Sequence, residues 1–233
     1  MLRTVVVVAA LACVAPACAQ VAGSATLLSD YRFRGISLSD DRPAAQFALD
    51  YDQPASGWYA GGMMSTARID ERNVVQLLAD AGYARRLGNG DWSWDAGLRY
   101  ARFTGPEHYA YAEAYAGLSY RQLTGRIHYA PDYFGFGDSA WYVELDGSHA
   151  LTPRWYLFAH VGWLRHGGDV ASDHTGRCRT DLRTGLGAAL APWDVRLGWT
   201  TVRGAHGPDL VYDYPASAGM SRSAWLLSVS YAW

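Results

Sequence analysis

The sequence lacks any apolar run long enough to cross a bilayer as a helix. A spanning helix needs about 20 consecutive apolar residues, and the longest apolar stretch, residues 5–14, is shorter than that. It follows Arg3 and precedes the small residues Ala17 and Ala19, an arrangement typical of a secretory leader. We therefore predict a signal peptide over residues 1–19, cleaved after Ala19, and a mature chain over residues 20–233.

Cysteine is also scarce, with three residues in the whole chain. Two of them, Cys13 and Cys18, fall in the predicted leader, and lipid attachment there would need a larger apolar residue three positions earlier than Ala10 or Ala15. The mature chain keeps only Cys178, which excludes an internal disulfide, and no zinc-type Cys/His spacing surrounds it. We predict no metal site and no cofactor.

The chain lacks an excess of charge of either sign. Its formal net charge is -2, which argues against nucleic-acid binding. The mean hydropathy is only -0.12 although 50% of the residues are hydrophobic, so apolar and polar residues must be interspersed. Ten Trp, sixteen Tyr and 25 Gly complete a composition that favours a curved, aromatic-rich β-structure.

Alternation of apolar and polar residues is the dominant pattern of the mature chain. It is clearest at the end, where Trp225, Leu227, Val229, Tyr231 and Trp233 alternate with mostly small or polar residues. Segments of this kind predict twelve strands, at residues 24–34, 44–52, 57–66, 74–85, 92–102, 109–120, 122–130, 140–150, 154–165, 179–190, 193–202 and 223–233.

The connections between these segments alternate in length. Short ones lie at residues 53–56, 86–91, 121, 151–153 and 191–192, and the intervening ones are longer. Outer-membrane barrels have an even number of strands, short periplasmic turns and longer extracellular loops. We therefore predict an all-β fold, a single antiparallel transmembrane β-barrel in the bacterial outer membrane, in contact with its lipid, with both ends of the mature chain on the periplasmic side.

The lipid-facing side of a strand can be assigned from its large apolar residues. In the segment 154–165, Trp155 and Trp163 bracket one face, and eight residues at about 3.3 Å each, tilted by about 40°, place the two rings roughly 20 Å apart along the membrane normal. That spacing is close to the apolar band of such barrels, about 25 Å. The predicted aromatic girdle consists of Trp92, Trp155, Trp163, Trp193, Trp199, Trp225 and Trp233.

The opposite faces of the strands carry the charged residues, so we expect these faces to line a pore. The residues predicted to line the pore are Asp30, Arg32, Arg34, Asp95, Arg99, Glu113, Arg126, Glu144, Asp146, Arg183 and Arg196. The inward faces hold ten acidic and seven basic side chains, a near balance that favours ion-pair ladders over a strongly selective filter. Glu144 and Asp146 share a face, where they could bind a cation, although pairing with arginines is the simpler interpretation.

The first predicted strand has a definite orientation in this scheme. Tyr31 and Phe33 are expected to face lipid, while Asp30, Arg32 and Arg34 face the lumen. Nothing between the early strands indicates an inward-folding plug, whereas the loop at residues 203–222 is long enough to fold inward.

Several motifs resemble a known family. The run Ser29-Asp30-Tyr31-Arg32-Phe33-Arg34-Gly35-Ile36-Ser37, the pair Pro43-Ala44, Gly57-Trp58-Tyr59, Tyr129-Ala130-Pro131-Asp132-Tyr133-Phe134 and Trp141-Tyr142-Val143-Glu144 are similar to those of the TorF-type porin family of proteobacteria, formerly a conserved family of unknown function. The resemblance spans nearly the whole mature chain. It implies an outer-membrane barrel and a pore, and it transfers no catalytic or ligand residue. The long loop at residues 203–222 departs from the pattern of that family.

Three functions remain open at this stage. The first is a pore for passive diffusion of small hydrophilic solutes. The second is a structural or recognition barrel, plugged by its own side chains and displaying its loops. The third, a lipid hydrolase, would have to use Ser148 and His149, which point to opposite faces of one strand. The aromatic C-terminal strand is also expected to engage the barrel-assembly machinery, and no subunit interface is evident.

Overall fold

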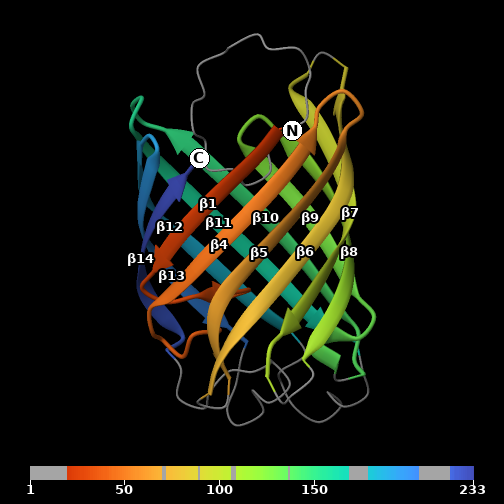
Figure 1. The fold of residues 1–233 in the computed structure, drawn as a ribbon, viewed down its shortest axis with the longest axis vertical. Coiled ribbons are helices and arrows are strands. Elements are labelled where there is room, and N and C mark those ends of the chain that lie inside the picture. Colours follow the sequence, from red (N-terminus) through yellow and green to blue (C-terminus); the bar gives the residue numbers. More distant parts are fainter. Residues whose placement is uncertain are drawn as a thin grey trace.

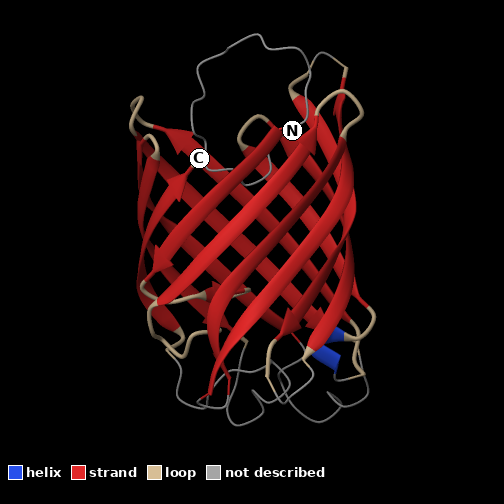
Figure 2. Cartoon of the chain, in the orientation of Figure 1, coloured by secondary structure: helices blue, strands red, loops and turns tan. Residues whose placement is uncertain are grey.

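The computed structural model describes residues 20–69, 72–88, 90–105, 109–135, 137–167, 178–204 and 221–233. Within them the chain forms a closed antiparallel barrel of twelve strands (Figures 1 and 2), as predicted from the alternation. The barrel strands are β1 (Gln20–Leu28), β4 (Ala44–Gln53), β5 (Trp58–Ile69), β6 (Arg72–Leu87), β7 (Trp92–Phe103), β8 (Ala110–Tyr120), β9 (Leu123–Ala130), β10 (Ala140–Ala150), β11 (Trp155–His166), β12 (Cys178–Leu190), β13 (Trp193–Arg203) and β14 (Ser223–Ala232).

The barrel closes where β1 pairs with β14. Gly23 and Trp233 exchange both backbone N–H···O bonds, each 3.1 Å long, so the closure continues to the last residue. β1 begins and β14 ends at the upper end of the barrel in Figure 1, which also carries the short connections and is called the short-turn end below. The opposite end is called the long-loop end. Among the described residues, no helix is long and apolar enough to span a membrane.

The outer wall is apolar from one end of the barrel to the other. Along β11, Trp155, Leu157, Val161 and Trp163 each keep 40% or more of their surface exposed, whereas Tyr156 points inward. A soluble protein rarely exposes a continuous apolar surface of this extent, because each exposed Å² costs about 25 cal/mol in water. The outer wall therefore has lipid as its solvent.

Inside the barrel, aromatic rings lie over glycines of neighbouring strands. Tyr59 lies directly opposite Gly82 on β6, and a Cβ atom added to that glycine would meet the phenol group. Tyr156 covers Gly187 on β12 in the same way. Without these glycines the rings would have no room against the wall, so the glycines of the inward faces allow large side chains to fill a narrow lumen.

The segment between β1 and β4 differs from the prediction. The barrel strand ends at Leu28, and the chain then turns inward through β2 (Arg32–Phe33) and β3 (Ile36–Ser37), a two-stranded hairpin outside the barrel sheet. Residues 29–43 are called the inserted segment below; Figure 1 shows its hairpin crossing the barrel near the lower end. The strand predicted over residues 24–34 is therefore correct only as far as Leu28, and the prediction of no plug between the early strands was wrong.

The burial of its side chains shows why the inserted segment lies inside the barrel. Tyr31 and Ile36 keep only 7% and 1% of their surface exposed, and Phe33 packs against interior residues, so neither Tyr31 nor Phe33 faces lipid. Leu38 and Tyr31 join an apolar cluster that fills the long-loop end of the lumen. A short 3-10 helix (Tyr133–Gly135) between β9 and β10 adds two further rings to this cluster. The long-loop end of the lumen is therefore packed.

One further difference concerns the loops. We predicted a long connection over residues 67–73, but β5 continues to Ile69 and β6 begins at Arg72, so the strands extend into it. The remaining long-loop connections lie at residues 104–109, 131–139, 167–177 and 204–222. Whether the last of these folds inward, as its length allows, concerns residues 205–220, which lie outside the described residues.

Candidate functional site

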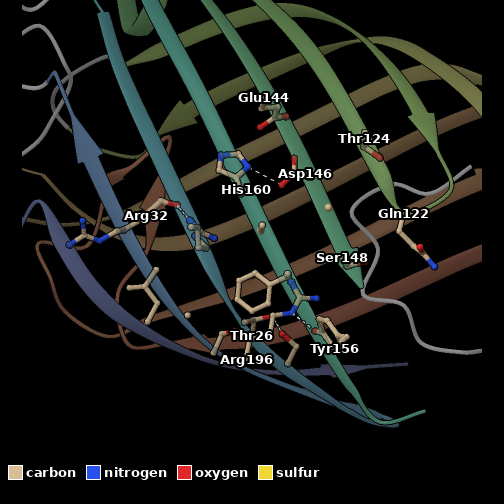
Figure 3. Close-up of a pocket in the computed structure, with 18 of the residues that line it drawn as sticks. Thr26, Arg32, Gln122, Thr124, Glu144, Asp146, Ser148, Tyr156, His160 and Arg196 are labelled. Carbon is tan, nitrogen blue, oxygen red and sulfur yellow. Dashed lines mark hydrogen bonds and ion pairs between the residues drawn. The ribbon is translucent and has the colours of Figure 1, made fainter. Parts of the chain in front are cut away.

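A cavity of about 680 Å³ occupies the lumen between the short-turn end and the inserted segment. Turn residues such as Gln122 and Pro153 line it at one end, and residues 30–34 of the inserted segment line it at the other. Figure 3 shows side chains of several strands pointing into this space, with Glu144 and His160 on one part of the wall. The volume is typical of small-molecule sites.

The inserted segment satisfies its own buried charges. The Asp30 carboxylate accepts hydrogen bonds from Arg32 Nε at 2.6 Å, Ser37 Oγ at 2.6 Å and Ser39 Oγ at 3.0 Å. Arg32 also donates through Nη2 to Asp41 Oδ1 at 2.7 Å. Because an unpaired charge is costly to bury, this network allows a polar hairpin to fold inside the barrel.

Arg34 and Tyr31 connect the inserted segment to the barrel wall through direct contacts. Arg34 Nη2 lies 2.6 Å from Glu113 Oε2 on β8, and its guanidinium carbon lies 4.4 Å from the ring centroid of Tyr142 on β10. The Tyr31 hydroxyl donates to Gln76 Oε1 on β6 at 2.6 Å. An ion pair, a cation–π contact and a neutral hydrogen bond, each to a different strand, hold the segment across the lumen.

The backbone of the segment is strained. Arg34, Asp40 and Asp41 adopt φ values of 50°, 60° and 53°, a left-handed conformation that costs non-glycine residues of order 1–3 kcal/mol each. Gly35 has φ 81°, and a Cβ there would lie 2.6 Å from the Cβ of Asp181 on β12. The turn therefore requires glycine where it touches the wall, and strain of this kind is typical of functional segments.

Most of the other residues that were predicted to line the pore form ion pairs on the barrel wall. Arg126 Nε lies 3.2 Å from Asp95 Oδ2, and Arg99 Nη1 lies 3.6 Å from Glu113 Oε1. Arg196 Nε lies 2.7 Å from Asp194 Oδ1 on the same strand. The eleven residues selected from sequence all lie inside the barrel: Asp30, Arg32 and Arg34 on the inserted segment, and Asp95, Arg99, Glu113, Arg126, Glu144, Asp146, Arg183 and Arg196 on inward strand faces.

Arginines and carboxylates do not line the cavity in equal numbers. Asp95, Glu113 and Asp194 are almost fully buried and do not line it. Its carboxylates are four: Asp30, Glu144, Asp146 and Asp181. Its arginines are seven: Arg32, Arg34, Arg99, Arg121, Arg154, Arg183 and Arg196. Among the residues that line the cavity, arginines therefore outnumber carboxylates, while Glu113 and Asp194 lie behind its surface and pair with Arg34, Arg99 and Arg196.

Two histidines form contacts that the sequence analysis did not identify. His128 on β9 bridges Glu113 Oε1 at 3.1 Å and Glu144 Oε1 at 3.0 Å. His160 on β11 bridges Asp146 Oδ1 at 2.8 Å and Asp181 Oδ1 at 3.0 Å. Glu144 and Asp146 thus form their ion pairs with histidines, where the sequence analysis expected arginines. The cross-strand register, which pairs Asp146 with His160, is the signal that would have identified the second bridge.

The predicted girdle residues lie on the outer wall. Trp92, Trp155 and Trp193 begin their strands at the short-turn end and are exposed by 44–49%. Trp225 and Trp233, at the two ends of β14, are exposed by 69% and 55%. Trp163 is exposed by 40%, whereas Trp199 is half-buried opposite Trp225.

The residues considered for hydrolysis do not meet. Ser148 lines the cavity, whereas the next residue, His149, is exposed on the outer wall of the same strand. A serine nucleophile needs its base within hydrogen-bond distance. These two residues are therefore not a nucleophile and base pair.

Comparison with known proteins gives a family and a fold. The family model described as a bacterial protein of unknown function (Gcw_chp) matches residues 13–231. No curated protein matches the chain. Among solved structures the chain is similar to the KdgM porin, with a TM-score of 0.56, 9% identity and coverage of 90% of this chain and 98% of that one. For the NanC porin the values are 0.56, 14%, 91% and 99%. At these identities the likeness shows a shared fold.

Proposed function

The chain belongs to Gcw_chp, a bacterial family of unknown function, and we propose that it is a porin through which small hydrophilic solutes diffuse passively. The barrel lies in the bacterial outer membrane. Its apolar outer wall fits lipid, and its closed sheet leaves no unpaired strand edge there. Like the KdgM and NanC porins that it resembles in fold, it has a lumen enclosed by antiparallel strands.

The observation that carries this proposal is the cavity inside the barrel, whose wall combines apolar side chains with many charged and hydroxyl groups. It runs from the short turns to the inserted segment, and arginines, carboxylates, hydroxyls and tyrosines line it. Water-filled charged lumens admit hydrophilic solutes without a covalent step. The inserted segment is then the constriction that limits solute size.

A liposome swelling assay with neutral solutes of increasing size tests the proposal. Vesicles that contain folded protein should swell in small sugars, more slowly as the solute grows, while vesicles with heat-unfolded protein should not. Swelling no faster than in protein-free vesicles, with folding shown by heat-dependent gel mobility, would contradict it.

The second candidate is a plugged recognition barrel. It is favoured by the apolar cluster at the long-loop end, where Leu38, Tyr133 and Phe134 pack inside the lumen. In that case the inserted segment would close the barrel permanently, and no solute would pass. A lipid hydrolase is not favoured, since Ser148 and His149 lie on opposite faces.

Three finer assignments complete the proposal. The motif at residues 29–37, which forms the inserted hairpin, supports membership in the TorF-type porin family. The apolar stretch before Ala17 and Ala19 supports a cleaved signal peptide over residues 1–19. The outward aromatic residues of β14 support recognition of the last strand by the barrel-assembly machinery.

A further inference from the structure

The cavity wall gathers three potential metal ligands on two neighbouring strands. Glu144 and Asp146 are two residues apart on the inward face of β10, and His160 lies opposite Asp146 on β11. One ligand atom from each of these residues lies within 4.8 Å of the others. In Figure 3 the three side chains face the same part of the cavity. Sites on paired strands are held more precisely than sites on loops.

Most of the negative charge at the cavity surface is concentrated here. Of the four carboxylates that line the cavity, Asp30 is neutralised by Arg32, and the other three are Glu144, Asp146 and Asp181. Arg183, the neighbouring arginine on β12, donates through Nη2 to the backbone oxygen of Arg32 at 3.3 Å. In the described part of the chain, these three carboxylates form their ion pairs with imidazoles, which carry charge only when protonated.

The side chains of Asp181 and His128 contact the proposed ligands in the way that neighbouring residues usually hold the ligands of a metal ion. Asp181 Oδ1 lies 3.0 Å from His160 Nε2 and can accept its proton, while the proton that His160 Nδ1 shares with Asp146 Oδ1 at 2.8 Å would be released to water when a metal ion takes its place. His128 Nε2 lies 3.0 Å from Glu144 Oε1 and orients that carboxylate. A histidine whose second nitrogen donates to a carboxylate is the usual form of a metal-bound histidine.

We propose that Glu144, Asp146 and His160 bind a divalent transition-metal ion, represented by Zn²⁺, on the wall of the cavity. One imidazole nitrogen and carboxylate oxygens suit this ion, and bonds of about 2.0–2.2 Å place tetrahedral ligand atoms roughly 3.3–3.6 Å apart. His160 Nδ1 and Asp146 Oδ1 are 2.8 Å apart, so only a small separation is required. Water or a passing anion would complete the coordination.

Isothermal titration calorimetry tests the site without any need for conduction. Zn²⁺ is titrated into detergent-solubilised, EDTA-treated protein, with Mg²⁺ as the comparison ion. We expect one Zn²⁺ site per chain that His160→Gln weakens by more than about tenfold. The matched control is His149→Gln, because His149 is on β10 but faces outward. The absence of Zn²⁺ binding, or equal affinity in His160→Gln and wild type, would overturn the proposal.

X-ray absorption spectroscopy of the zinc-loaded wild type keeps the test decisive if the variant does not fold. One imidazole and several oxygen ligands are expected, because His160 is the only histidine of the set. Coordination without imidazole, or by two or more imidazoles, would overturn the site. Because neither readout involves transport, loss of the zinc site and failure of the porin proposal are distinguishable.

Discussion

Arg34 is the residue that joins the inserted segment to the barrel wall. Its ion pair with Glu113 is buried, with side-chain exposures of 4% and 0%. Breaking a buried pair typically costs 3–5 kcal/mol, because the remaining charge loses its partner. Glu113 keeps contacts with His128 and Arg99, so we expect the lower end of that range.

Arg34→Gln should therefore destabilise the folded barrel by about 3 kcal/mol, which lowers the temperature at which its heat-dependent gel mobility changes. The control is Arg121→Gln, since Arg121 and Asp91 form an exposed pair that is 3.5 Å long. Such pairs contribute about 0–1 kcal/mol. Equal transition temperatures for the two variants would contradict the assigned role of Arg34.

Gly187 is a second residue whose identity is fixed by packing. A Cβ atom there would overlap the Tyr156 ring, whose hydroxyl donates to Asp194 at 2.7 Å. Gly187→Ala should cost about 1–3 kcal/mol, because the ring must leave its place on the wall. Gly62→Ala is the control, since its Cβ would lie 3.6 Å from the nearest atom. Thermal unfolding in detergent measures both, and equal losses would contradict the packing account.

Sequence reasoning identified charged residues of the lumen but missed the histidine bridges, for a physical reason. Charge and alternation show which face a side chain occupies, whereas a bridge depends on the register between strands. His160 meets Asp146 because β10 and β11 pair in one particular register. No periodicity within a single strand contains that information.

At the level of secondary structure, alternation predicted twelve strands because each barrel strand has one face in lipid and one in the lumen. The same signal failed at residues 29–37. Tyr31 and Phe33 alternate with Asp30, Arg32 and Arg34 there, although the apolar residues pack inside the barrel. A lumen that contains its own apolar cluster offers a second place to bury such a face, and alternation does not distinguish the two.

The closing strand gives a prediction of its own. Trp233 exchanges backbone hydrogen bonds with Gly23, and its ring occupies the space where a Gly23 side chain would be. Trp233→Ala should lower the fraction of folded protein recovered from the outer membrane, as judged by heat-dependent gel mobility, because the ring that packs over Gly23 and against Phe47 is lost. Trp92→Ala, which alters the girdle away from the closing strand, is the control. Equal recovery of the two variants would contradict this role.

At the scale of the whole molecule, the field in the cavity follows from which charges reach it. Seven arginines and four carboxylates line it, so we expect a preference for anions over cations. The reversal potential in a KCl gradient measures this preference. It should be larger at about 0.1 M than at about 1 M salt, where the Debye length falls from about 10 Å to about 3 Å.

Replacing Arg183 should weaken that preference, because Arg183 lines the cavity. Arg183→Gln is compared with Arg165→Gln, since Arg165 is exposed on the outer face of β11. A reversal potential that favours cations in the wild type, or an equal shift in both variants, would contradict the assignment of the field to the cavity arginines.

The central claim is that the inserted segment constricts a pore within a twelve-stranded barrel. Single-channel conductance in a planar bilayer tests it most directly, with wild type compared with a variant in which residues 30–42 are replaced by a short Gly-Ser turn. We predict reproducible current steps for the wild type and larger steps for the variant, because the segment crosses the lumen. Steps of equal size in both proteins, or none from either once folding is shown, would contradict the account.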